Sequence, residues 1–156
     1  MEESTRGDRL TQLGNTVPLP GNPDEALLET FPNPHPDVDY VIRLTSSEFT
    51  TLCPITGQPD FATIIVDYVP GAHIMESKSF KLFLGSFRNH GTFHEDCTVY
   101  IHKRLQRTLQ PKYIRVVALW NPRGGVPIDV TIQSGSLPSF CSPLPLGATT
   151  YRAGRE

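Results

Sequence analysis

The sequence predicts a single α+β domain, in which a four-stranded antiparallel sheet carries two helices on one face. The 156 residues suit one domain. Apolar residues alternate with polar ones in two segments before residue 70 and in two after residue 112, whereas the segment between them has apolar residues at helical spacing. The order strand–strand–helix–helix–strand–strand is typical of an α+β layer fold.

The first two predicted strands enclose a loop. Residues 38–45 alternate to give one strongly apolar face, and residues 61–69 are rich in β-branched side chains. Residues 54–59 contain two prolines and one glycine, which are turn signals. Such a loop holds its side chains at the surface of a scaffold, where substrates reach them.

Two helices are predicted next. The first is indicated by four apolar residues along one helical stripe, Phe80, Phe83, Leu84 and Phe87. We expect this helix to end at residues 89–91. Thr92 followed by Glu95 has the spacing of a capping box, which would open the second helix, and Pro111 would end it.

Two more strands complete the predicted sheet, at residues 113–120 and 126–133, with a turn between them at 121–125. A four-stranded sheet leaves two open edges, which invite pairing with another chain, so we expect a homo-oligomer. Proline is frequent toward both ends of the chain. The predicted parts are therefore an extended proline-rich arm at 1–37, a main domain at 38–136 and a C-terminal tail at 137–156.

Composition narrows the class of protein. The formal net charge of −2 gives no bulk attraction for nucleic acid or for an anionic membrane. The N-terminal residues are polar and charged, without the apolar core of a signal peptide, and no later segment approaches membrane-spanning length. We therefore expect a cytoplasmic protein with reduced thiols, whose partners include neither nucleic acid nor membrane.

Cys53 and Asp60 are the candidate catalytic pair. Cys53 stands at the start of the predicted loop and Asp60 just before the second strand, where they would converge as a nucleophile beside a proton carrier. A lone cysteine in a cytosolic protein is also commonly a small buried apolar residue. An aspartate after Gln-Pro is commonly a turn residue. These two residues alone leave both interpretations open.

Both predicted helices begin with charged residues. Lys78 and Lys81 lie on one stripe near a helix start, where backbone N–H groups attract phosphate, unless this stripe is simply a solvated face. Glu95 either caps the second helix or offers two carboxylate oxygens to the paired N–H donors of a guanine-like edge. The sequence has no Gly-x-Gly-x-x-Gly motif, so a nicotinamide cofactor would not bind in the Rossmann manner.

Three motifs together resemble a known enzyme family. Residues 76–83, Glu-Ser-Lys-Ser-Phe-Lys-Leu-Phe, are similar to the signature of the NADPH-dependent 7-cyano-7-deazaguanine reductases, the nitrile reductases of queuosine biosynthesis, which have the tunnelling fold. The loop at 52–54, continuing to 59–61, resembles their nucleophile loop, and residues 93–95 resemble their substrate-recognition segment. The resemblance spans residues 38–132, and so the arm and the tail lie outside it.

The resemblance implies a mechanism. Cys53 would add to the nitrile carbon to form a thioimide, and Asp60 would supply the proton to the nitrile nitrogen, a task that favours a partly buried carboxyl group. Two NADPH molecules would then deliver hydrides in turn and give 7-aminomethyl-7-deazaguanine. By the same resemblance, the residues that bind the 7-cyano-7-deazaguanine substrate are Met75, Glu76, Ser77, His94 and Glu95.

Further expectations concern the cofactor and the assembly. We expect Lys78 and Lys81 to bind the extra phosphate of NADPH. The resemblance implies a homo-oligomeric ring with active sites near subunit interfaces. Cys97 lies two residues after Glu95 on the inward stripe of the second helix. We expect it near Cys53, where oxidation would close a protective disulfide.

Two alternatives belong to other classes of function. A zinc-dependent tunnelling-fold enzyme of the GTP cyclohydrolase kind would share a purine-like pocket and a glutamate anchor, with Cys53, His94 and Cys97 as candidate ligands. Against it, Thr56 stands where a Cys-x-x-His motif around Cys53 would have histidine. A non-catalytic, ring-forming binding protein would leave Cys53 inert to electrophiles.

Overall fold

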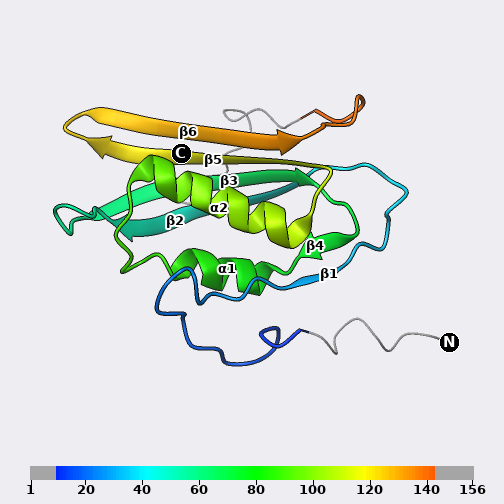
Figure 1. Cartoon of the computed structure of the whole chain (residues 1–156), viewed down its shortest axis with the longest axis horizontal. Coiled ribbons are helices and arrows are strands. Elements are labelled where there is room, and N and C mark those ends of the chain that lie inside the picture. Colours follow the sequence, from blue (N-terminus) through cyan, green and yellow to red (C-terminus); the bar gives the residue numbers. More distant parts are fainter. Residues whose placement is uncertain (1–9, 143–156) are drawn as a thin grey trace.

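The structure, a computed structural model, describes residues 10–142, and the ribbon in Figure 1 shows how the strands and helices of this part are arranged. In chain order the elements are β1 (Thr30–Pro32), β2 (Ile42–Leu52), β3 (Pro59–Val69), β4 (His73–Met75), α1 (Ser77–Gly85), α2 (His94–Leu109), β5 (Tyr113–Arg123) and β6 (Val126–Gly135). Neither described helix is long and apolar enough to cross a membrane. Most of the predicted tail, residues 143–156, and residues 1–9 of the predicted arm lie outside the described residues.

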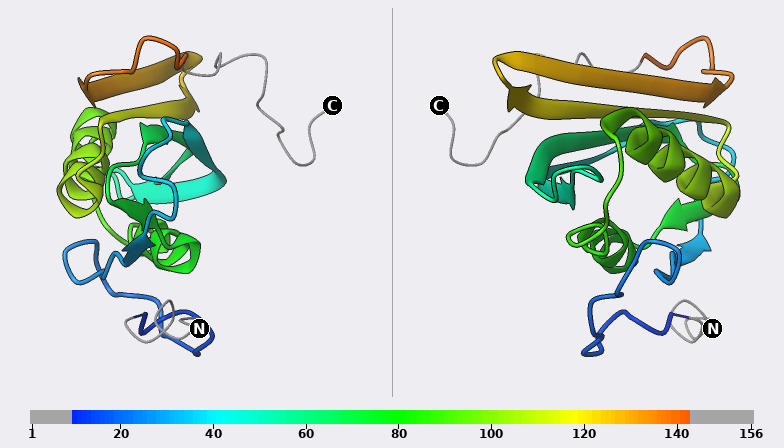
Figure 2. Two further views of the ribbon diagram at one scale, coloured as in Figure 1. Left: turned by 90° about the vertical axis from the view of Figure 1, so that its right-hand side faces the viewer. Right: turned by 60° about the vertical axis from the view of Figure 1, so that its left-hand side comes forward.

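The main sheet has four antiparallel strands in the order β2-β3-β5-β6. Helix α2 packs against β5 and β6, and α1 lies beside β2. Both helices cover the same face of the curved sheet, as the two views in Figure 2 show. The predicted α+β class, with two helices between two pairs of strands, is therefore confirmed.

The core lies between this sheet face and the helices. Strands β3 and β5 send alternate side chains into it: Ala62, Ile64, Val66 and Tyr68 from β3, and Ile114, Val116, Ala118 and Trp120 from β5. The helical stripes supply the other side of the core: Phe80, Phe83, Leu84, Phe87, Cys97, Ile101, Leu105 and Leu109. Burial of each large apolar side chain contributes about 1.5–3 kcal/mol relative to exposure, so this face fixes the helices on the sheet.

The first strand of the main sheet is displaced from its predicted position. It runs from Ile42 to Leu52, whereas the sequence predicted a strand at 38–45. Val38 is exposed and precedes the strand. Pairing with β3 extends β2 through a polar run, and an irregularity between Ser46 and Phe49 changes the alternation so that Phe49 reaches the core. Strand pairing therefore carries β2 to the residue before Cys53.

Strand β5 is longer than predicted. It continues to Arg123, which pairs with Val126, so that only Gly124 and Gly125 form the turn to β6. The φ angles of these glycines are 56° and 82°, and two successive positive φ angles are typical of a two-residue hairpin turn. The predicted turn at 121–125 is thus too long, and Arg123 belongs to a strand rather than to a loop.

The described part of the N-terminal arm packs on the main domain. It contains no helix, as predicted, but it contributes β1, which pairs with β4 in a separate two-stranded sheet that the sequence did not predict. Arg104 of α2 donates hydrogen bonds of 2.7 Å to the carbonyl oxygens of Pro23 and Ala26. The backbone N–H of Thr11 donates to the Glu29 carboxylate at 2.7 Å. The domain boundary at residue 37 stays a prediction.

Candidate active site

Cys53 lies in a tight turn between β2 and β3. The backbone N–H of Cys53 donates to the Gln58 carbonyl at 2.8 Å, and the Gly57 N–H donates to the Cys53 carbonyl at 2.9 Å. Gly57 has a φ of 69°, a conformation that glycine adopts without the strain of a side chain. The backbone N–H and the backbone carbonyl of Cys53 are therefore both held by hydrogen bonds within the turn.

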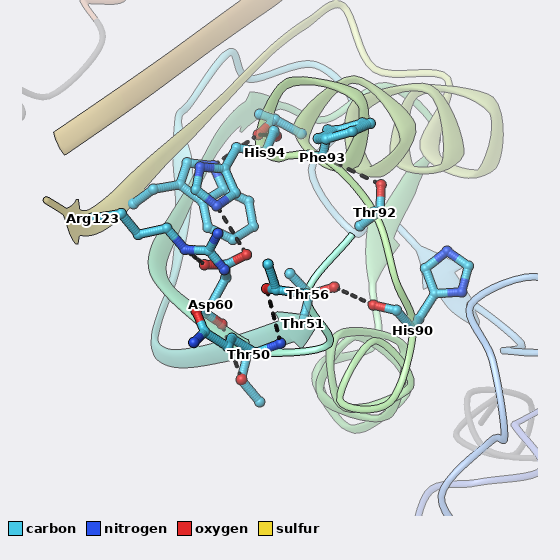
Figure 3. A network of polar contacts seen from close by, with 12 residues as sticks. Thr50, Thr51, Thr56, Asp60, His90, Thr92, Phe93, His94 and Arg123 are labelled. Atoms are coloured by element: carbon cyan, nitrogen blue, oxygen red, sulfur yellow. Dashed lines mark hydrogen bonds and ion pairs between the residues drawn. The ribbon is translucent and has the colours of Figure 1, made fainter. Parts of the chain in front are cut away.

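The segment that leads into α2 lies alongside this turn. The Leu52 N–H donates to the His90 carbonyl at 3.0 Å, and the Thr92 N–H donates to the Leu52 carbonyl at 3.0 Å. The Thr51 hydroxyl also donates to the His90 carbonyl, at 2.5 Å, as Figure 3 shows. These bonds bring the first residues of α2 to the mouth of the Cys53 turn.

A cavity of about 250 Å³ forms where the turn, the start of α2 and the end of β5 meet. Its lining comprises Cys53, Pro54, Asp60, Thr92, Phe93, His94, Glu95, Arg123 and Ile128. Four of the residues that the sequence singled out, Cys53, Asp60, His94 and Glu95, thus come together around one opening. We call this opening, with its lining residues, the Cys53 cavity.

Asp60 is the most enclosed charged group of the Cys53 cavity, with 5% of its side chain exposed. Its Oδ1 lies 2.5 Å from Nε of Arg123, and its Oδ2 lies 3.2 Å from Nε2 of His94 (Figure 3). The His94 ring stacks on Trp120 with a centroid distance of 4.1 Å and an interplanar angle of 7°. The predicted burial of Asp60 is therefore present, and the carboxylate is held from both sides.

The Cys53 thiol is acidic in this setting. Hydrogen bonds from the Thr56 hydroxyl and the Thr56 N–H, then from Arg123 and the Ile55 N–H, lower the pKa of Cys53 to about 6. Because the thiolate is the nucleophilic form of cysteine, this lowered pKa favours the reactive form of Cys53 at neutral pH. The predicted roles of Cys53 as the nucleophile and of Asp60 as the proton donor stay predictions.

Glu95 does not cap α2. The helix begins at His94 with Phe93 as its N-cap, and no side chain donates or accepts a capping hydrogen bond there. The Thr92 N–H, which the predicted capping box assigned to Glu95, donates instead to Leu52. The capping-box prediction was wrong because Thr92 pairs with the Cys53 turn. Glu95 is exposed and lines the cavity, and its role as a substrate anchor stays a prediction.

The second group of predicted site residues lies at the start of α1. Glu76 is 3% exposed and is the N-cap of the helix, where its carboxylate oxygens accept hydrogen bonds of 2.8 Å from the N–H groups of Lys78 and Ser79. The neighbouring Met75 is also buried. Two of the N–H groups that were expected to attract a phosphate, those of Lys78 and Ser79, are thus already bound to Glu76.

The two lysines of α1 differ in their surroundings. The Lys78 ammonium group donates to the Gln12 carbonyl at 2.6 Å and also to the Asn15 carbonyl, both in the N-terminal arm. Lys81 is exposed, and together with Ser77 it lines a cavity of about 450 Å³ between α1 and β2. We call this second opening the α1 cavity. Neither Cys53 nor Asp60 lines it.

Sequence reasoning missed three residues of the Cys53 cavity and its support. Thr56 and Trp120 carried no catalytic motif, and Arg123 stood in a predicted turn. The Gly124-Gly125 pair was the available signal for Arg123, since two glycines alone suffice for a hairpin turn and would have left Arg123 at a strand end.

Cys97 and the zinc alternative gain no support from the described residues. Cys97 is 1% exposed, and burial raises the pKa of its thiol far above the ordinary value. Both Cys53 and Cys97 are free thiols, and the predicted disulfide between them stays a prediction. Among residues 10–142, no group of three or more His, Cys, Asp or Glu side chains is placed to hold a metal ion.

Known proteins resemble this chain over most of its length. A family model described as QueF-like protein matches residues 59–139. The NADPH-dependent 7-cyano-7-deazaguanine reductase of Syntrophobacter fumaroxidans is 66% identical over 146 residues, covering 94% of each chain. The protein of the same name from Parvibaculum lavamentivorans is 58% identical over 92% of this chain and 93% of that relative.

The fold has a solved counterpart. The structure described as the archaeosine synthase QueF-Like in the apo form superimposes with a TM-score of 0.58 at 26% sequence identity. The match covers 63% of this chain and 96% of that one.

Proposed function

The chain belongs to the family of NADPH-dependent 7-cyano-7-deazaguanine reductases, and we propose that it reduces the nitrile of 7-cyano-7-deazaguanine to an aminomethyl group through a covalent bond to Cys53. The product would serve tRNA queuosine biosynthesis. One observation carries the covalent mechanism: an acidic cysteine and a buried aspartate line the same small cavity.

The first step uses both residues. The Cys53 thiolate forms a bond to the nitrile carbon, and one electron pair of the C≡N bond moves to the nitrogen. That nitrogen takes a proton from Asp60, so that a neutral thioimide results. Covalent attachment divides one difficult reduction into easier steps. His94 lies 3.2 Å from Asp60 and stacks on Trp120, so its ring holds the carboxyl group in position for this transfer.

Glu95 is the proposed anchor for the deazaguanine ring. Its exposed carboxylate lines the Cys53 cavity at the first turn of α2 and makes no capping bond. Two carboxylate oxygens suit the paired N–H donors of a guanine-like edge. His94 stands beside it at the same helix start. The substrate would thus enter with its ring edge toward α2 and its nitrile toward Cys53.

The α1 cavity has a donor set that fits NADPH. Lys81 offers an exposed ammonium group and Ser77 an exposed hydroxyl, and both suit a phosphate. Lys78 retains part of its donor capacity, since its ammonium group has three N–H bonds and two carbonyl partners. NADPH, when bound, supplies the hydride that each of the two reductions requires.

The separation of the two cavities supports an assembly of several subunits. Cys53 and Asp60 line one cavity, and Ser77 and Lys81 line the other. In a homo-oligomeric ring, the α1 cavity of one subunit would complete the Cys53 cavity of its neighbour, with β2 and β6 as the free edges for pairing. Such an enzyme would act in the cytoplasm on a small molecule, without contacting nucleic acid or membrane.

The test of the covalent mechanism is intact mass spectrometry of the protein mixed with the nitrile substrate in the absence of NADPH. We expect the mass of one substrate molecule to be added per subunit and peptide mapping to place it on Cys53. Addition of NADPH should then discharge the adduct. The Cys53→Ser variant should form no adduct. If the wild-type protein reduces the nitrile but no Cys53 adduct can be trapped, the thioimide mechanism is contradicted.

Subunit mixing tests the shared site. Cys53→Ala protein and Ser77→Ala/Lys81→Ala protein should each be impaired alone. Mixed after dissociation and reassembly, they should regain part of the activity, because some interfaces then combine two intact halves. If mixed and unmixed samples have equal activity, each active site uses both cavities of the same subunit.

A further inference from the structure

We propose that the Arg123 guanidinium is a positioning residue that serves as the shared counter-ion of the Cys53 thiolate and the Asp60 carboxylate, and that its attraction is divided between them. This inference rests on the proposed function, because it assigns to Cys53 and Asp60 the roles of nucleophile and proton donor. It adds a residue that the sequence motifs did not include and a coupling between the two groups.

The geometry of Arg123 supports this role. Its Nε lies 2.5 Å from Oδ1 of Asp60, and Arg123 lines the same cavity as Cys53. The nearby guanidinium is also one of the causes that lower the pKa of the Cys53 thiol. Figure 3 shows the Arg123 side chain extended toward Asp60. The Gly124-Gly125 turn keeps Arg123 on the strand, where its backbone direction is fixed by pairing with Val126. A planar guanidinium presents several N–H donors at once, which allows one cation to contact two acceptors.

The Cys53 cavity contains more groups that can become anions than it contains permanent cations. Its titratable groups are Cys53, Asp60, His94, Glu95 and Arg123. Arg123 is the only permanent cation among them, whereas the thiolate and the two carboxylates are anions when ionised. Attraction of Arg123 to one anion weakens its hold on the other, and the anions also repel each other. The ionisation of Cys53 is therefore coupled to the charge of Asp60.

The coupling has a consequence for the reaction. When Asp60 carries the proton that it will donate, it no longer competes for Arg123, and the cation stabilises the thiolate. When the thiolate has added to the nitrile carbon and Asp60 has lost its proton, the negative charge has moved from sulfur to carboxylate. Arg123, which is ion-paired with Asp60 in the structure, then stabilises the carboxylate. One cation thereby stabilises the anion on each side of the step.

The experiment measures the rate of Cys53 alkylation by iodoacetamide from pH 4.5 to 9, by peptide mass mapping. The thiolate displaces iodide, so the rate constant follows the thiolate fraction and falls as the pH drops through about 6 in the wild type. This reagent needs no substrate recognition. A failure of the nitrile adduct would thus overturn the proposed function, while the alkylation profiles would still decide the role of Arg123.

Two substitutions should move the alkylation midpoint in opposite directions. Arg123→Gln removes the cation and should raise the midpoint by about one unit or more, the scale expected for loss of an opposite charge at close range. Asp60→Asn removes the competing anion and should lower the midpoint, so that alkylation at pH 5 is faster than in the wild type. In the Arg123→Gln background, Asp60→Asn should have a smaller effect, because no cation remains to be released.

The controls separate charge from folding. Arg107→Gln, on the last turn of α2 and about 20 Å along the helix from His94, should leave the midpoint unchanged. Cys141, which lies outside the Cys53 cavity, provides an internal reference rate. If Arg123→Gln melts early, Arg123→Lys retains the charge without the planar fork and should give an intermediate midpoint.

Three outcomes would overturn the proposal. The first is an unchanged midpoint in folded Arg123→Gln. The second is a raised midpoint in Asp60→Asn, which would make Asp60 the base that deprotonates Cys53. The third is full additivity of the two substitutions, which would make their effects on the thiol independent.

Discussion

The Cys53 cavity and the start of α1 both carry charged residues that resemble family motifs, but they differ in what those residues contact. In the Cys53 cavity, Asp60, His94 and Arg123 contact one another around an opening. At the start of α1, the Glu76 carboxylate binds backbone N–H groups of its own helix, and Lys78 binds carbonyls of the N-terminal arm. The first group is arranged around a space, and the second group mainly holds the chain together.

This difference predicts different consequences of mutation. A buried carboxylate that caps a helix typically contributes about 0.5–2 kcal/mol to stability, which substitution removes whatever the enzyme binds. A side chain that faces an opening contributes little to the fold and much to chemistry. Substitution of the exposed Glu95 should therefore alter substrate binding at nearly constant melting temperature, and substitutions at Glu76 and Lys78 should alter stability first. Asp60 is buried and ion-paired with Arg123, so its replacement should alter both catalysis and stability.

The largest effect is expected from Cys53→Ala. Removal of the nucleophile should abolish turnover, while binding of 7-cyano-7-deazaguanine stays close to wild type because Glu95 and His94 are untouched. Steady-state assays and calorimetric titration measure the two quantities. Cys141→Ala, a cysteine outside the Cys53 cavity, is the matched control and should retain activity. Substantial reduction of the nitrile by Cys53→Ala would rule out the covalent route.

Asp60→Asn should have the next largest effect. Asparagine cannot donate the proton to the nitrile nitrogen, so adduct formation should slow by about 10²–10⁴-fold, the usual contribution of general acid catalysis. The same variant should carry a more ionised Cys53. A faster reaction with iodoacetamide together with a slower reaction with the nitrile would identify Asp60 as the proton donor. Adduct formation at the wild-type rate would show that the role is wrong.

Glu95→Gln tests the anchor. Glutamine places an NH₂ group against an N–H donor of the deazaguanine, and a buried mismatch of this kind costs about 1–3 kcal/mol or more. Substrate affinity should fall roughly ten- to several-hundred-fold at nearly unchanged melting temperature. The matched variant Glu76→Gln should show a lower melting temperature, because Glu76 does cap its helix. If Glu95→Gln lowers the melting temperature but leaves the substrate affinity unchanged, Glu95 has a structural role and is not the substrate anchor.

Sequence patterns predicted the elements whose signals are local. Strand β3 and the end of α2 lie within two residues of their expected positions, because β-branched alternation and helical spacing reflect neighbouring residues. The extension of β2 to Leu52 and of β5 to Arg123 depends on pairing with β3 and β6, which a single segment does not display. The capping box failed for the same reason, since Thr92 has a partner forty residues earlier in the chain.

The candidate site divides in the same way. Short motifs singled out Cys53, Asp60 and Glu95 as candidates, and the structure gathers them with His94 around one cavity. The acidity of Cys53 could not be predicted, since it depends on Thr56 within the turn and on a strand end seventy residues away. Nor did any pattern reveal that Lys78 contacts the N-terminal arm, because the arm has no motif and its contacts are made through backbone carbonyls.

The smallest effects should come from the two lysines of α1, and they should differ in kind. Lys81→Ala removes an exposed charge from the α1 cavity. It should raise the KM for NADPH by up to about tenfold, equivalent to about 1.4 kcal/mol, and leave the KM for NADH nearly unchanged, because only NADPH carries the extra phosphate. Its melting temperature should match the wild type.

Lys78→Ala should instead lower the melting temperature by about 2–4 °C, since two hydrogen bonds to the arm, from the lysine to Gln12 and Asn15, contribute together on the order of 1 kcal/mol. Its effect on the KM for NADPH should be smaller than that of Lys81→Ala, because two of its donors are already bound to carbonyl groups. Kinetics with both cofactors and thermal melts of each single variant measure the contrast. If Lys78→Ala raises the KM for NADPH at least as much as Lys81→Ala and melts like the wild type, the arm releases the Lys78 ammonium group when the cofactor binds. The start of α1 would then be a binding site of the same kind as the Cys53 cavity, and the contrast between the two regions would fail.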